Sequence, residues 1–140
     1  ISIGDIEFVD AGSIRNVNPN YPTPGRTQNC VNCSVATDAT LGGTPATALP
    51  SSGPVSVSVL EKHFGTKFSS AIPKEYIELE MITAGEGSRG IVLGLRGPGQ
   101  VGHVFNVVNQ NGIVRFLDGQ TGAPASFSGF KEFRLLKTTP

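Results

Sequence analysis

Apolar and polar residues follow different spacings in the two halves of this chain. Up to residue 85, apolar side chains recur at the spacing typical of helices, which predicts helices over residues 30–41, 56–64 and 73–85. Beyond it, short runs rich in valine, isoleucine and phenylalanine predict strands over residues 90–95, 102–108, 112–118 and 131–137. Helices followed by an antiparallel meander indicate an α+β domain.

The helix over residues 30–41 is expected to be buried, because most of its circumference is small or apolar. Asn29 is placed to cap its first turn, and Gly42 and Gly43 provide a stop signal. In the later helix over residues 73–85, Pro73 suits the first turn.

The sequence before the helix over residues 30–41 predicts no further helix. Residues 16–28 contain three prolines, one glycine and three asparagines, which favours an extended loop. Within residues 1–14, apolar and acidic side chains alternate, which predicts a short strand or an extended arm. We expect residues 1–140 to form one domain, in which residues 1–28 lead into the helix at Cys30.

Composition narrows the classes of function. The chain has 140 residues, with 11 Lys and Arg and 11 Asp and Glu, so its formal net charge is zero. Without a basic excess, a nucleic-acid partner is not expected. No apolar run is long enough to predict a membrane span. The sequence starts at Ile1 and shows no signal peptide, which we interpret as a piece excised or processed from a longer protein.

The two cysteines lie in one tetrapeptide, so they predict no disulfide scaffold. A zinc site would need a second pair of ligands, and His63 and His103 are forty residues apart, so we expect no metal and no cofactor. Cys30 itself opens the predicted helix. There the helix dipole and the free N–H groups of the first turn stabilise a thiolate, the nucleophilic form of cysteine.

His103 and Asp118 are candidates for the rest of a catalytic group. Asn109-Gln110-Asn111-Gly112 is a strong hairpin signal between two predicted strands. A turn centred between residues 110 and 111 places His103 opposite Asp118 on paired strands. A carboxylate beside an imidazole fixes its tautomer and stabilises the imidazolium, so thiol, His and Asp follow one another as in a catalytic triad.

Three motifs in this order resemble the papain-fold toxin domains described as glutamine deamidases. Residues 28–38, QNCVNCSVATD, are similar to the nucleophile motif of that family. Residues 102–108, GHVFNVV, and 116–122, FLDGQTG, are similar to its His and Asp/Gln motifs. The resemblance implies a papain-like fold in which the nucleophile helix packs on a small antiparallel sheet.

The resemblance also implies that Cys30 attacks a glutamine side-chain amide, with His103 as general base and acid and Asp118 as the orienting carboxylate. Gln28, Asn29 and Gln120 are the candidates for oxyanion or substrate binding. Papain-like proteases carry an oxyanion-hole glutamine about six residues before the nucleophile, and Pro24 stands there in this chain. Gln28 or the backbone N–H of Cys30 is the expected substitute.

Cys33 is the alternative nucleophile, because papain-type CxxCW signatures use the second cysteine. The family pattern places the nucleophile directly after the asparagine, which favours Cys30, and the helix dipole weakens beyond the first turn. Alone, Cys33 is expected to be a small buried residue.

As implied by the family, the partners are a target protein with a reactive glutamine, a larger secreted bacterial carrier and a cognate immunity protein. The carrier would deliver the domain into the cytosol of a target cell. Two other functions stay open. One is a cysteine protease or transglutaminase with the same triad, and the other is a binding module in which Cys30 and His103 are structural.

Overall fold

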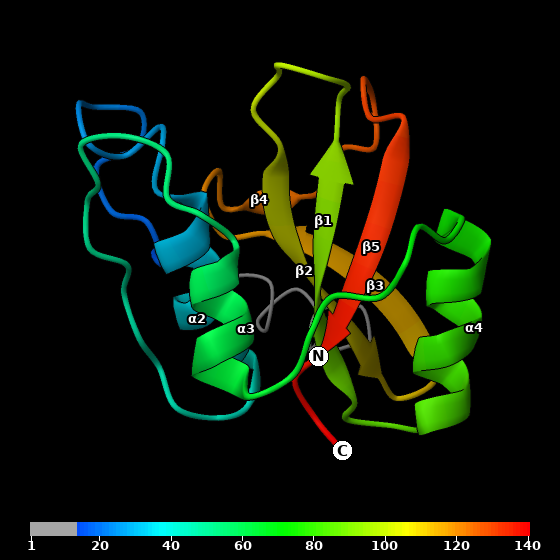
Figure 1. Ribbon diagram of the computed structural model, residues 1–140. Helices are drawn as coiled ribbons and strands as arrows, with labels where there is room; N and C mark the ends of the chain where they lie inside the picture. The colour runs from blue at the N-terminus through cyan, green and yellow to red at the C-terminus, as the bar shows by residue number, and fades with distance from the viewer. Residues whose placement is uncertain (1–13) are drawn as a thin grey trace.

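The computed structural model describes residues 14–140 (Figure 1). Within this range, helices precede strands, which confirms the α+β fold class. The helices are α2 (Cys30–Leu41), α3 (Ser58–Phe64) and α4 (Lys74–Ala84). The strands are β1 (Arg89–Leu95), β2 (His103–Gln110), β3 (Ile113–Asp118), β4 (Ala123–Pro124) and β5 (Glu132–Lys137). The arm or strand predicted over residues 1–14 lies, up to residue 13, outside the described residues.

The strands form one antiparallel sheet in the order β4-β3-β2-β1-β5. The predicted meander holds for β1 to β4 but is wrong for β5, which returns to pair with β1. The reason is burial on both faces of β5, where Leu135 and Leu136 are almost fully buried. The sequence did not predict the short strand β4, whose two residues are exposed. By contrast, β1 packs against helices on both faces of the sheet.

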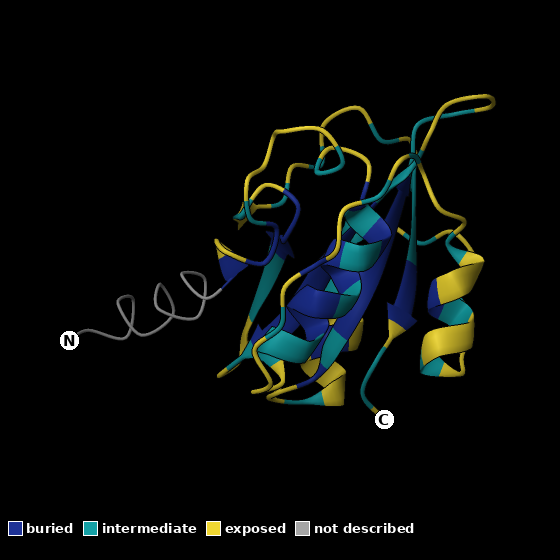
Figure 2. Ribbon diagram, turned by 90° about the vertical axis from the view of Figure 1, so that its left-hand side faces the viewer, coloured by how far each residue is buried: buried dark blue, intermediate teal, exposed yellow. Residues whose placement is uncertain are grey.

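The helices divide between the two faces of the sheet. In Figure 1, α2 and α3 lie on one side and α4 on the other. Successive residues of β2 point to opposite faces, so Val104 packs with α2 and α3, while Phe105 packs with α4. Buried residues are concentrated in β1, β2 and α2, whereas α4 has a largely exposed outer surface (Figure 2). The sheet therefore supports two separate layers of core.

The turn between β2 and β3 lies one residue later than predicted. Gln110 pairs with Ile113, and the two loop residues Asn111 and Gly112 both have positive φ angles, 56° and 90°. These are the conformations of a tight two-residue hairpin turn. Because Asn106 pairs with Leu117, the predicted pairing of His103 with Asp118 is wrong by two residues. The two side chains are diagonal neighbours on the same face.

Two predicted helix signals also need correction. Asn29 precedes α2, but its side chain does not cap the helix and binds elsewhere, as described below. Its backbone carbonyl starts the helix by accepting a hydrogen bond from the N–H of Cys33 at 2.9 Å. Pro73 takes the N-cap position of α4 rather than its first turn, with an extended ψ of 156°. The predicted burial of α2 is confirmed, with half of its residues buried.

Candidate active site

Cys30 is the first residue of α2 and is half-buried. It borders a groove with a volume of about 390 Å³, whose wall also includes His103 from the start of β2. The proline-rich segment before α2 cannot adopt a helical conformation. The helix therefore begins only at Cys30, at the edge of the groove. The thiol therefore lies at a helix N-terminus, where a negative charge is stabilised.

His103 and Asp118 are in direct contact across the end of the β2–β3 hairpin. Nε2 of His103 lies 2.7 Å from Oδ2 of Asp118, and only 16% and 11% of the two side chains are exposed. Because a carboxylate only accepts, Nε2 donates this bond. The second oxygen of Asp118 accepts from the backbone N–H of Gln120 at 3.0 Å. Both oxygens are engaged, so the carboxylate is fixed in its orientation.

The His103 ring borders the same groove as Cys30, which also acts on its pKa. Burial alone lowers the pKa of His103, but hydrogen bonds to Asp118 and to Cys30, and the negative charges of both, outweigh it. Together they raise the pKa of His103 from 6.5 to about 9. Since Nε2 is engaged by Asp118, Nδ1 is the nitrogen left for the thiol. The imidazolium form is thus favoured over the range of neutral pH.

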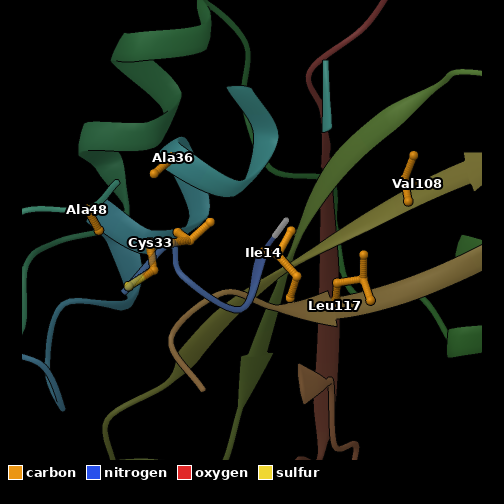
Figure 3. Packing of buried hydrophobic residues seen from close by; sticks show 7 residues of the cluster. Ile14, Cys33, Ala36, Ala48, Val108 and Leu117 are labelled. Carbon is orange, nitrogen blue, oxygen red and sulfur yellow. The ribbon is translucent and has the colours of Figure 1, made fainter. Parts of the chain in front are cut away.

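Cys33 lies in a different environment from Cys30, although both belong to α2. Its side chain is 2% exposed and packs with Ile14, Ala36 and Leu117 (Figure 3). Burial is the main cause that raises the pKa of Cys33 to about 12, and the negative charges of Cys30 and Asp118 add to it. Cys33 is therefore held as a neutral thiol inside the core.

A network of buried side-chain amides lies beneath the start of α2. The carboxamide of Asn29 donates to Oδ1 of Asn18 at 2.9 Å and to the carbonyl of Leu49 at 3.1 Å. Asn18 in turn donates to the carbonyls of Arg26 and Gln120, at 2.8 and 2.9 Å. Asn18 and Asn29 are only 4% and 1% exposed. This amide network joins the segment before α2 to the loop after Asp118.

Gly119 allows this loop to approach α2 closely. A side-chain carbon at this position would overlap Oγ1 of Thr37 and would lie 3.3 Å from the carbonyl of Cys33. Only glycine leaves room for the backbone there. This close approach places Asp118 beside the first turns of α2. Packing as well as hydrogen bonding therefore sets the distance between α2 and the loop after β3.

The three candidate binding residues lie in different places. Gln28 is exposed and lines the groove beside Cys30. Gln120 also lines the groove but is mostly buried, and its Nε2 donates to Oδ1 of Asn29 at 3.4 Å. Asn29 points into the amide network rather than the groove. Sequence reasoning missed Asn18, because an asparagine in a proline-rich loop carries no signal beyond turn formation.

The groove is mainly apolar. Its apolar walls come from the loop before α3, from β1 and from the start of β2. Polar groups in the lining are supplied by Thr27, Gln28, Arg96, His103 and Gln120. Within residues 14–140, no three His, Cys, Asp or Glu side chains gather where they could hold a metal ion. None of the helices described is long and apolar enough to span a membrane.

Residues 28–123 match the family model described as papain fold toxin 1, glutamine deamidase. The chain belongs to this family. The match covers more than half of the chain and includes Cys30, His103 and Asp118. It identifies the protein as a toxin domain of the papain-like enzyme type.

A structure of the Salmonella effector SpvD, in its R161 variant, is similar to this fold. The TM-score is 0.54 with 20% sequence identity, covering 96% of this chain and 78% of that chain. At this identity the similarity concerns the fold. A comparison with curated proteins found no match.

Proposed function

We propose that this domain deamidates glutamine side chains of a target protein, with Cys30 as the nucleophile, His103 as the general base and acid, and Asp118 as the orienting carboxylate. The observation that carries the proposal is the placement of His103. Its Nε2 is bonded to Asp118 at 2.7 Å, and its ring borders the same groove as the thiol at the start of α2. The family match supports glutamine as the substrate.

The reaction begins from a thiolate and an imidazolium. The Cys30 sulfur attacks the amide carbon of the glutamine side chain, and a carbon–sulfur bond forms as the carbonyl oxygen gains negative charge. His103 then gives its proton to the amide nitrogen, the carbon–nitrogen bond breaks, and ammonia leaves. The product is a thioester between Cys30 and the side chain of the target.

Water completes the cycle. The now neutral His103 takes a proton from water, whose oxygen attacks the thioester carbon. The carbon–sulfur bond breaks, glutamate is released, and the thiolate–imidazolium pair returns. Asp118 acts throughout by stabilising the imidazolium and by holding its Nε2–H.

Gln28 and the backbone N–H of Cys30 are the proposed donors to the oxyanion. Gln28 borders the same groove as the thiol, and the Cys30 N–H is among the unpaired donors of the first helical turn. Gln120 helps to position the site, since its side chain donates to Asn29 and its backbone N–H donates to Asp118. Asn29 has a positioning role in this scheme.

The experiment compares Cys30→Ala with Cys33→Ala. On a responsive target protein or glutamine peptide, Cys30→Ala should lower ammonia release by more than about a thousandfold, whereas Cys33→Ala should keep most of it. Mass spectrometry should show an increase of about one dalton in the target. Loss of ammonia release in Cys33→Ala but not in Cys30→Ala would reverse the assignment.

The same mass measurement separates the remaining functions. Peptide-bond cleavage would identify a protease, and a new amide link would identify a transglutaminase, each with the same nucleophile. A binding module would leave the target unchanged and would not need Cys30. We further propose that a larger secreted bacterial carrier delivers the domain to the cytosol of the target cell, and that an immunity protein protects the producer.

A further inference from the structure

Arg96 lies where two hollows meet beside His103. One is the groove that borders Cys30. The other is a smaller hollow of about 270 Å³, which Asp118 and the segment around Ser126 and Ser128 also line. Both hollows include Arg96 and His103 in their walls. A peptide segment that presents a glutamine to Cys30 must therefore pass close to the guanidinium of Arg96.

The side chain of Arg96 is held in place without a carboxylate. Its Nη1 donates to the carbonyl of Val101 at 2.6 Å, and its guanidinium carbon lies 4.7 Å from the centre of the Phe130 ring. By contrast, Arg89 and Arg134 are each paired with a carboxylate, at 3.2 and 2.7 Å. Among the described residues, no Asp or Glu forms an ion pair with Arg96.

The surroundings leave this positive charge uncompensated. The wall of the Cys30 groove contains no Asp or Glu. Asp118 is the acidic residue in the wall of the smaller hollow, and it pairs with His103 rather than with Arg96. The Phe130 ring and the mainly apolar wall of the Cys30 groove reduce the solvation of the guanidinium where they cover it, which strengthens its attraction for an anion. A cationic side chain in the same position would be repelled.

We infer that the target glutamine lies beside an acidic residue, whose carboxylate pairs with Arg96. This inference rests on the proposed function for its substrate and adds a determinant of specificity. The remaining N–H groups of the guanidinium form a planar set of donors that suits a carboxylate. The hydrogen bond to Val101 and the cation–π contact with Phe130 pre-orient them, so less conformational entropy is lost on binding.

Binding to the Cys30→Ala variant tests the inference separately from catalysis. The probes are three glutamine pentapeptides with blocked ends, which carry Glu, Ser or Lys on both sides of the glutamine. The Glu peptide should bind about fivefold more tightly than the Ser peptide, and the Lys peptide should bind least. Adding Arg96→Glu should reverse the order of the Glu and Lys peptides.

Lys67→Glu is the matched control, because it makes the same charge change at an exposed residue outside both hollows. It should leave the order of the three peptides unchanged. If Arg96 only braced its loop, Arg96→Glu would weaken all three peptides equally. That result, equal binding of the three peptides, or no measurable binding would overturn the inference.

Ammonia release by the domain with Cys30 intact distinguishes the two proposals. Release without a preference among the flanking residues would retain the deamidase and reject the role of Arg96. A charge preference in binding without ammonia release from any substrate would retain the role of Arg96 in recognition and reject deamidation.

Discussion

The two faces of the sheet are built from different kinds of side chains. On the α4 face, five phenylalanines pack with ring centroids 4.8 to 6.4 Å apart, namely Phe105, Phe116, Phe127, Phe130 and Phe133. On the α2 face, the buried side chains are smaller, and several are polar, including Asn18, Asn29, Asp38 and Asn106. The first face provides apolar area, and the second provides fixed polar contacts.

This difference indicates how the domain separates support from chemistry. Aromatic rings bury much area without needing polar partners, so the α4 face can stabilise the sheet on its own. The amides of the α2 face are costly to bury unless each is bonded, but they fix the positions of the groups they bind. His103 connects the two, since its ring lies 6.3 Å from that of Phe105 on the same strand.

The largest expected effect on stability comes from a substitution that disrupts packing on the α4 face alone. Ile77 and Ile82 both belong to α4, but Ile77 is 0% and Ile82 54% exposed. Ile77→Ala should lower the free energy of unfolding by about 2–5 kcal/mol, because it leaves a cavity, whereas Ile82→Ala should change it by about 0.5 kcal/mol or less. Denaturant titration measures both.

Activity completes this test. Below its unfolding transition, Ile77→Ala should keep the kcat of the unaltered domain, because the substitution is on the face away from Cys30. A large loss of kcat in a folded Ile77→Ala domain would show that the two faces are not separable.

The second prediction concerns pH and applies to His103, which connects the two faces. Because the pKa of His103 is raised from 6.5 to about 9 in the folded domain, folding favours its protonated form. The resulting stabilisation should be complete below about pH 6.5 and should be lost as the pH rises through about 9. Its size is about 3 kcal/mol at most.

Unfolding free energies from pH 6 to pH 10 measure this loss in the unaltered domain, in His103→Gln and in Ile77→Ala. The loss assigned to His103 should disappear in His103→Gln and remain in Ile77→Ala. Parallel pH curves for the unaltered domain and His103→Gln would contradict the raised pKa.

The smallest of the three effects concerns the amide network. Asn18→Ala removes the bonds to the carbonyls of Arg26 and Gln120 and leaves them buried, so it should cost about 1–3 kcal/mol of stability. It should also slow the alkylation of Cys30, since Asn29 loses a partner directly before the thiol.

Asn32→Ala provides the control, because Asn32, like Asn29, donates to the carbonyl of Leu49 but is more exposed and lies outside the amide network. It should change the free energy of unfolding and the rate of alkylation little. An Asn18→Ala domain that is destabilised but alkylated at an unchanged rate would show that the network has no positioning role.

Local patterns were sufficient to predict most elements of the fold. The buried helix at Cys30 and the strands from β1 to β3 follow from apolar spacing and turn residues. The position of β5 in the sheet did not follow, because its local pattern is compatible with pairing at either edge of the meander. Only pairing with β1 buries both Leu135 and Leu136. Such a choice depends on the whole fold rather than on any segment.

The candidate site shows the same division. Asp118 could be placed near His103 from the hairpin, and the error of one residue in the turn moved the register without changing the face. Asn18 could not be found, because its bonding partners are up to 102 positions away in the sequence. The groove and the uncompensated charge of Arg96 likewise emerge only when separate loops meet.

The return of β5 to β1 has a consequence for shortened forms of the chain. Leu93 and Leu95 of β1 line the groove beside Cys30, and β1 is flanked by β2 on one side and β5 on the other. Thr138, directly after β5, bonds to Asp38 of α2 at 2.6 Å, beside Arg89. In a chain that lacks residues 132–138, β1 has no partner at the β5 edge and Asp38 has no bond to Thr138. We therefore expect a partial chain that ends before β5 to lack a fully supported groove and to be inactive.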